Sequence, residues 1–271
     1  MSEIRKINHR LVTCFQSSGR IGKSTVLEGI LAWAAFAGIP AGAVDCDAEH
    51  RTLSKRFPAT LFVDATRSKD EFLQLIMDLP DAPLAVADFP AQATEFLLNA
   101  MDAFRVLDAL DASETRLTVL MFGADDPTAT ASMAKTYRAL GNRVDYIVVK
   151  NPARFRSRLF DESSLAELFR QRKVPVIELP AITATTLQQI NAASAERKRH
   201  LTFAEAVKTP SLPALCRFEI EHFLNRVYVQ CEDAAEVLVP DTKLIQNCVM
   251  HLADRLTAKP IDEFSPLDIH E

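Results

Sequence analysis

The sequence predicts an α/β protein in which helices cover both faces of a mostly parallel β-sheet. Short apolar runs rich in β-branched residues alternate with segments of helical periodicity over roughly the first 200 residues. The apolar runs are nearly continuous, which is typical of strands that are buried on both faces. Polar residues follow several of these runs, and ligands of open α/β sheets bind at the carboxyl ends of the strands. These features together predict βαβ units.

The predicted strands are apolar runs that end in turn-forming or acidic residues, namely 11–15, 41–46, 59–65, 83–88, 116–123, 144–151 and 174–180. The predicted helices have apolar residues at helical spacing, and they are 23–38, 68–79, 93–110, 130–141 and 163–173. Ser68 is a suitable residue to cap the second of these helices, and Gly38 is suited to ending the first.

The pattern changes from about residue 201, where strands give way to helical segments over 216–229 and 242–257. We expect residues 1–200 to form the sheet domain and 201–271 to form a helical extension packed on it. The final residues are acidic and rich in proline, which predicts a frayed end.

The composition is that of an ordinary globular protein. The 271 residues are 48% hydrophobic and 25% charged, with a formal net charge of -5, so the whole surface does not favour a nucleic acid or an anionic membrane. The odd number of cysteines and the absence of a C-x-x-C pair favour buried free thiols in a reducing compartment. There is no signal-peptide pattern and no apolar run of membrane-spanning length. We therefore expect a cytoplasmic protein.

Residues 17–25 read SSGRIGKST and lie between the first predicted strand and its helix. A strand-to-helix turn offers backbone N–H groups and a helix N-terminus to a phosphate. Gly22 allows close approach of the backbone, Lys23 is predicted to reach the β- and γ-phosphates, the Ser24 hydroxyl to hold Mg²⁺, and Thr25 to contact the α-phosphate. The alternative is a plain turn, because a Walker A motif has glycine at the first position of this stretch.

Two acidic segments follow strands of the same predicted sheet. In DCDAEHRTL, Asp47 is predicted to orient an attacking water and Asp45 to support Mg²⁺ through a water, unless both acids simply end the strand in solvent. In LAVADFPAQ, Asp88 follows an apolar strand, as the metal-holding carboxylate of a Walker B segment does.

The segments SGRIGKST, DCDAEHRTL and DFPA, in this order, resemble the ParA/MinD group of deviant Walker A ATPases over about residues 10–205. The resemblance implies the three-layer α/β/α fold of a P-loop NTPase, with ATP and Mg²⁺ as ligands. It also implies a face-to-face homodimer that ATP closes and hydrolysis reopens. Lys23 then corresponds to the phosphate lysine, Ser24 to the metal ligand, Asp47 to the switch aspartate and Asp88 to the Walker B acid.

Two further segments extend the resemblance to the base of the nucleotide. KNPARF is similar to the family segment whose asparagine contacts adenine, which implies this role for Asn151. ELPAI is similar to the family's proline-bearing loop near the base, which assigns Pro180 to the cofactor site.

The loop departs from the family at two positions. The family's signature lysine, which reaches the other subunit's phosphates, falls at Ser18, and its second glycine falls at Arg20. Either Arg20 supplies a replacement catalytic cation, or the dimer hydrolyses ATP very slowly. Ser18 and Gly19 are still expected to contribute to the phosphate site, with Gly19 free to adopt positive φ. These departures suit a divergent relative, such as the StbB-like or mobilisation-associated ATPases of plasmids.

The expected function is a slowly hydrolysing dimerisation switch in plasmid partition, DNA positioning or conjugative transfer, with a protein partner. Nonspecific DNA binding is expected through phosphate neutralisation, although a solvated helix face is the alternative. The cations concerned are Arg154, Arg156, Arg158, Arg197, Lys198 and Arg199. The acidic tail disfavours membrane binding. Two other functions stay open, a small-molecule kinase or ligase and a nucleotide-binding adaptor with negligible hydrolysis.

Overall fold

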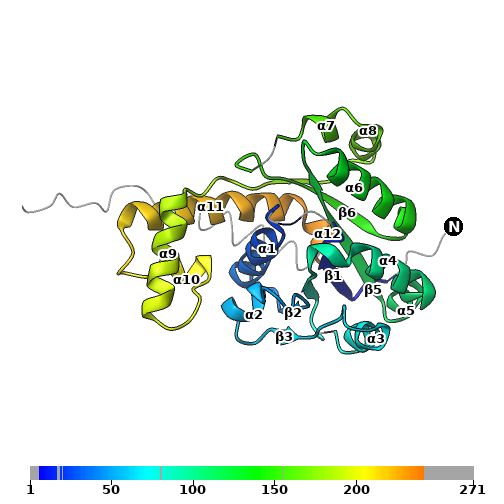
Figure 1. Ribbon diagram of the computed structural model, residues 1–271, viewed down its shortest axis with the longest axis horizontal. Helices are drawn as coiled ribbons and strands as arrows, with labels where there is room; N and C mark the ends of the chain where they lie inside the picture. The colour runs from blue at the N-terminus through cyan, green and yellow to red at the C-terminus, as the bar shows by residue number, and fades with distance from the viewer. Residues whose placement is uncertain (1–5, 17–18, 20, 80, 155, 241–271) are drawn as a thin grey trace, which may run out of the picture.

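The computed structural model describes residues 6–240 except 17, 18, 20, 80 and 155. Its centre is a seven-stranded sheet in the order β3-β2-β4-β1-β5-β6-β7 (Figure 1). Every strand pairing is parallel. The strands are β1 His9–Thr13, β2 Ala41–Asp45, β3 Leu61–Phe62, β4 Leu84–Asp88, β5 Thr115–Gly123, β6 Asp145–Lys150 and β7 Val176–Glu178. The predicted α/β class and parallel sheet are confirmed.

The longer helices are α1 Lys23–Ala37, α3 Lys69–Met77, α4 Thr94–Ala103, α5 Val106–Ala112, α6 Pro127–Leu140, α8 Ser164–Gln171, α9 Ala184–Glu196 and α11 Ala214–Asp233. The shorter ones are α2 Thr52–Arg56, α7 Arg158–Asp161, α10 Phe203–Val207 and α12 Ala235–Leu238. The predicted caps are present, because Ser68 accepts from the Glu71 amide at 3.1 Å and Gly38 ends α1 with a left-handed φ of 72°. None of the described helices is long and apolar enough to cross a membrane.

Alternate residues of the central strands enter two separate cores, one on each face of the sheet. Val12 and Val86 belong to the core that α1, α10 and α11 share. Leu11 and Ala85 belong to the core that α3, α4, α5, α6 and α8 share. Each strand is therefore buried on both sides, which explains its nearly continuous apolar sequence. The result is a three-layer α/β/α architecture.

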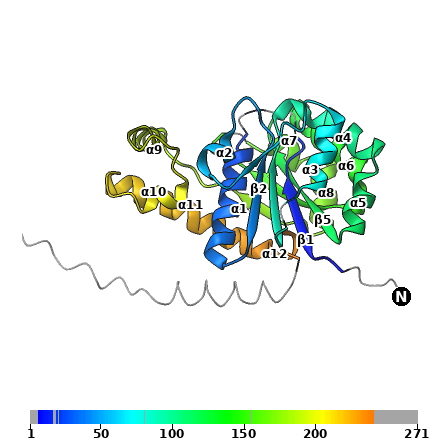
Figure 2. The ribbon, with the colours of Figure 1, turned by 90° about the horizontal axis from the view of Figure 1, so that it is seen from below.

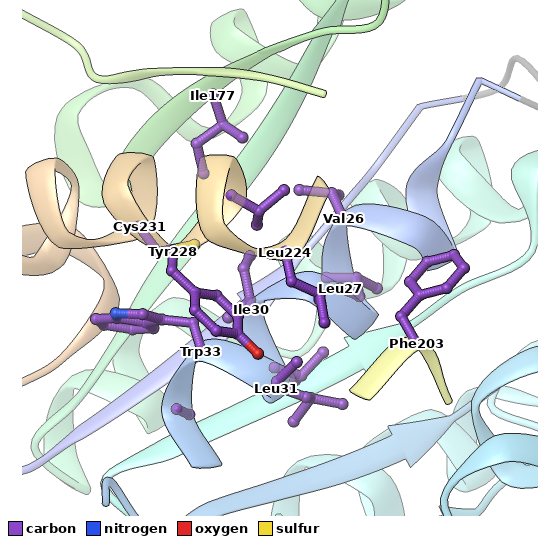
Figure 3. Packing of buried hydrophobic residues seen from close by; sticks show 14 of the residues in the cluster. Val26, Leu27, Ile30, Leu31, Trp33, Ile177, Phe203, Leu224, Tyr228 and Cys231 are labelled. Carbon is purple, nitrogen blue, oxygen red and sulfur yellow. The ribbon is translucent and has the colours of Figure 1, made fainter. Parts of the chain in front are cut away.

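Helix α1 is held on its face of the sheet by α11. Figure 3 shows Ile30 and Trp33 of α1 packed with Leu224 and Tyr228 of α11. The helices approach closely at Gly29, where an added Cβ would lie 2.9 Å from Val227 Cγ1. The amino-terminal part of α11 extends away from the sheet, and α9 and α10 lie near that end of the helix (Figures 1 and 2).

The predicted helices need correction. The helix expected over 93–110 is two helices, α4 and α5, separated at Arg105, whose φ is 51°. Buried Met101 and Val106 are five residues apart, so one regular helix would place them about 140° apart around its axis. The break returns both to the same core. Helix α9 was not expected, and α11 is longer than 216–229 on both sides. The segment 242–257 lies outside the described residues.

Candidate functional site

The turn after β1 is anchored at its beginning by a buried glutamine. Gln16 Nε2 donates to the Phe122 carbonyl at 2.9 Å, and the Phe122 amide donates to Gln16 Oε1 at 2.8 Å. The paired amide groups continue the contact between β1 and β5 beyond the last paired residues, Thr13 and Val119. Thr136 of α6 adds a hydrogen bond to the Phe15 carbonyl at 3.1 Å. Gln16 is not among the predicted site residues, although a polar residue directly after an apolar strand is a signal for such a role.

The end of the turn requires glycine. Gly22 caps the N-terminus of α1 with a φ of 105°, a conformation that residues with a Cβ rarely adopt. A Cβ at this position would lie 2.8 Å from Asn151 Nδ2 and 3.1 Å from Leu179 Cδ1. The main chain of the turn is therefore packed directly against the ends of β6 and β7. Gly19 differs, because a Cβ there would meet nothing within 4 Å.

Lys23 is the first residue of α1, and its side chain extends back across the turn. Its Nζ donates to the Gln16 carbonyl at 3.3 Å, so the ammonium group lies at the anchored beginning of the turn. The cation and the positive end of the helix dipole thus face the same small region. This arrangement favours an anion such as a phosphate group.

Ser24 connects the turn to the strand that ends in Asp88. The Ser24 hydroxyl donates to Asp88 Oδ2 at 2.6 Å. Asp88 is the last residue of β4, which lies next to β1 in the sheet. A hydroxyl oxygen and a carboxylate are hard oxygen ligands of the kind that Mg²⁺ accepts.

Asp88 lies in an unfavourable environment for a charge. Only 4% of the residue is exposed. Burial raises the pKa of Asp88 to about 6, the hydrogen bond from Ser24 and the charge of Lys23 lower it, and the charges of Asp45 and Asp47 raise it. The electrostatic effects place the four charged side chains in one neighbourhood. A buried strand-end acid with a raised pKa next to a cation is a candidate functional group.

Asp45 and Asp47 both hold the backbone of the segment after β2. Asp45 is fully buried, and it accepts from the Asp47 amide at 3.0 Å and the Ser54 amide at 2.8 Å. Asp47 accepts from the Glu49 and His50 amides at 3.0 and 2.9 Å, and its Oδ2 lies 3.3 Å from His50 Nδ1. Neither acid simply ends the strand in solvent. Their proposed roles toward Mg²⁺ and water stay predictions.

The two residues that are predicted to lie near the base of the nucleotide, Asn151 and Pro180, lie beside the same turn. Asn151 follows β6, and its Nδ2 donates to the Ile21 carbonyl at 3.0 Å. Pro180 follows Leu179, whose amide extends the β6–β7 contact through the Lys150 carbonyl at 2.8 Å. Thr25 is half-buried in the first turn of α1. Ser18 and Arg20 lie outside the described residues.

The basic side chains of the DNA prediction fall into two groups. Arg158 pairs with Glu162 at 2.8 Å, and Arg199 pairs with Glu205 at 2.7 Å. Those that are exposed and have no ion pair with another described residue are Arg154, Arg156, Arg197 and Lys198.

The site fits a magnesium–nucleotide complex on three observations. The backbone at Gly22 is packed so closely that a Cβ would not fit. The Lys23 side chain extends across that turn, and the Ser24 hydroxyl donates to the buried carboxylate of Asp88. Mg²⁺ in nucleotide sites takes one or two protein ligands together with phosphate oxygens and waters. The described residues contain no group of three or more His, Cys, Asp or Glu side chains that could hold a metal.

Comparison with known proteins gives no matching family model and no matching curated protein. Among solved structures, the crystal structure of FlhF complexed with GMPPNP and Mg²⁺ has a TM-score of 0.36 and 14% identity, covering 64% of this chain and 64% of that one. The nucleotide-binding protein in complex with ADP from Archaeoglobus fulgidus has a TM-score of 0.39 and 16% identity, covering 67% and 85%. The MinC:MinD cell division protein complex of Aquifex aeolicus has a TM-score of 0.39 and 13% identity, covering 97% and 100%. At these scores, function rests on the site itself.

Proposed function

We propose that this chain binds ATP with Mg²⁺ at the turn between β1 and α1 and hydrolyses it slowly to ADP and phosphate. The observation that carries the proposal is the 2.6 Å contact between Ser24 and Asp88. This contact brings the carboxylate of Asp88, at the end of β4, to the first turn of α1. Lys23, which directly precedes Ser24, faces the same space. This combination is the one that phosphoryl-transfer sites use to hold a metal beside a triphosphate.

Each residue has a distinct part in this proposal. Lys23 offsets negative charge on the β- and γ-phosphates, and the backbone around Gly22 supplies N–H donors. Mg²⁺, when bound through Ser24, Asp88 and water, neutralises charge that develops on the phosphate oxygens. Asp47 orients the attacking water. Asp45 supports the metal through a water, and its contacts to the Asp47 and Ser54 amides fix the segment that carries Asp47.

The proposal extends to a nucleotide-dependent homodimer. An ATP-driven switch of this kind suits plasmid partition, DNA positioning or conjugative transfer, and its cargo is reached through a protein partner. Arg20 is the candidate to supply the cation that the family's signature lysine supplies elsewhere. Arg20→Ala leaves turnover unchanged if this role is absent, in which case slow hydrolysis follows from the missing lysine.

DNA binding is the second part of this extension. The exposed Arg154, Arg156, Arg197 and Lys198 would neutralise DNA phosphates without reading sequence. We expect retention of DNA that requires ATP and weakens steeply with salt. A gel shift that ATP does not alter, or none at low salt, contradicts this part and leaves the nucleotide site intact.

The central test is titration calorimetry of ATP with and without Mg²⁺. We expect binding by the wild-type protein, and at least a tenfold weaker affinity for Lys23→Ala, since a charge-assisted contact is worth about 1.5–3 kcal/mol. Lys208→Ala is the matched control, because Lys208 is an exposed lysine at the end of α10. Equal binding by Lys23→Ala and the wild type contradicts the proposal.

Size-exclusion chromatography with ADP and with ATP then separates the possible functions. A switch dimerises with ATP alone and releases phosphate. A kinase or ligase shows no such dependence. An adaptor dimerises and releases phosphate no faster than the uncatalysed background.

A further inference from the structure

Asn151 touches the phosphate-binding turn itself. It follows β6, which β5 separates from β1 in the sheet, and so its side chain extends past the end of β5 to reach the turn. Its Nδ2 donates to the Ile21 carbonyl at 3.0 Å. The same nitrogen would lie 2.8 Å from a Cβ on Gly22. The amide therefore contacts the two residues that immediately precede Lys23.

The hydrogen bond fixes the orientation of one peptide group. The described residues contain no cis peptide bond, so the Ile21 carbonyl and the Gly22 N–H point in opposite directions. With the carbonyl held toward Asn151, the Gly22 N–H points to the opposite side of the peptide plane. A rotation of this peptide would exchange the two groups, and it would present a carbonyl oxygen where a phosphate requires a donor.

Glycine makes such a rotation easy. A residue without a Cβ occupies positive and negative φ about equally well, so the backbone conformation of Gly22 does not hold the peptide by itself. Gln16 holds the beginning of the turn through both Phe122 backbone groups, and neither of these hydrogen bonds involves this peptide. In the described part of the turn, Asn151 is the side chain that donates a hydrogen bond to it.

Asn151 retains hydrogen-bonding capacity for a second partner. An asparagine amide offers two N–H donors and a carbonyl oxygen. One donor is used by Ile21, and the described residues make no other side-chain hydrogen bond with Asn151. The second N–H and Oδ1 remain for the edge of a purine base.

We propose that Asn151 is a positioning residue that orients the Ile21–Gly22 peptide for phosphate binding while its remaining amide groups contact the base. Recognition of the base and the grip on the phosphates are thus coupled through one side chain. This inference rests on the proposed nucleotide site, and it adds a role that does not require a base to be present.

Inorganic tripolyphosphate with Mg²⁺ tests that role, because it carries phosphates and no base. Calorimetry would measure its affinity and that of ATP for the wild type, for Asn151→Leu, which is similar in size and has no donor, and for Asn191→Leu, a control on the exposed face of α9. We expect Asn151→Leu to bind tripolyphosphate about tenfold more weakly, as the loss of one hydrogen bond of about 1.4 kcal/mol implies. The loss for ATP is larger, about 100-fold, because the base contact disappears as well.

The outcomes separate the possible explanations. If Asn151→Leu weakens ATP and leaves tripolyphosphate unchanged, the side chain contacts only the base and the inference is wrong. If neither affinity changes, Asn151 has no role in the site and the inference is equally wrong. If the wild type binds neither ligand, the proposed function itself fails. Thermal unfolding of each variant identifies a folding defect, and Asn151→Ser, which is smaller and cannot reach Ile21 as asparagine does, replaces Asn151→Leu in that case.

Discussion

Neutralising Asp88 should make the protein more stable. Burial raises the pKa of this carboxyl from 3.8 to about 6, so the folded state binds its proton more tightly than the unfolded chain does. Below pH 3.8 the group is protonated in both states and has no effect. Above pH 6 it is ionised in both, and the folded state is destabilised by about 3 kcal/mol, since a tenfold change in proton affinity corresponds to about 1.4 kcal/mol.

Asp88→Asn removes this charge and retains an oxygen that accepts from Ser24. Urea unfolding of the ligand-free protein should show the variant more stable than the wild type by about 2 kcal/mol at pH 5 and about 3 kcal/mol at pH 8. The increase of about 1 kcal/mol between the two pH values is the diagnostic result. A variant that is less stable than the wild type at pH 8, or an advantage that does not change with pH, refutes the reasoning.

Asp145→Asn is the matched control, with the opposite expectation. Burial alone would raise the pKa of Asp145, but hydrogen bonds from Arg116 and Arg10 hold it below its usual value. Its ionised form therefore stabilises the fold above its ordinary pKa, and that stability is lost as the pH falls through the lowered value. At pH 8 we expect Asp145→Asn to be destabilised by about 3 kcal/mol, because two arginines lose their partner.

Two further predictions concern the packing around α1. Arg56→Met removes the ion-pair partner of Glu28, whose side chain is 1% exposed and also accepts from the Phe203 amide at 2.7 Å. Chemical denaturation should show a loss of about 3 kcal/mol, and a loss below about 1 kcal/mol would mean that the carboxylate is satisfied without Arg56. Gly29→Val should lower the unfolding free energy by about 2 kcal/mol, because its Cβ would lie 2.9 Å from Val227 Cγ1. Val227→Ala should restore part of that loss, and additive effects of the two substitutions would contradict a direct contact.

The sheet could be predicted from the sequence because its strands carry a local signal. A strand covered on both faces is a nearly continuous apolar run, and the acids at the ends of β2 and β4 mark where those runs end in the sequence. The break between α4 and α5 could not be predicted, because the apolar spacing within 93–110 is that of one continuous helix. The break becomes evident only when Met101 and Val106 are seen to enter the same core. Helix α9 lacks a strong apolar stripe, since its sequence reads ATTLQQINAASAE.

The candidate site was predictable in its residues and less so in its contacts. Lys23, Ser24 and Asp88 follow from motifs, and the structure places Ser24 against Asp88. The buried amide of Gln16 and the reach of Asn151 to Ile21 depend on contacts across 106 and 130 residues of sequence. Such contacts exist only after β5 and β6 have taken their places in the sheet, so the sequence around each residue does not identify its partner.

Aspartates at the two ends of the sheet have different partners, and this difference supports the proposed function. Asp145, at the beginning of β6, has two arginines as partners, which is how a structural carboxylate is stabilised. Asp88, at the end of β4, accepts from the Ser24 hydroxyl and lies near the charge of Lys23, while the charges of Asp45 and Asp47 raise its pKa. A fold selected for stability alone would gain from a neutral residue at position 88. A carboxylate with such a destabilising effect is expected where a cation binds, because a bound divalent ion reverses the sign of the interaction.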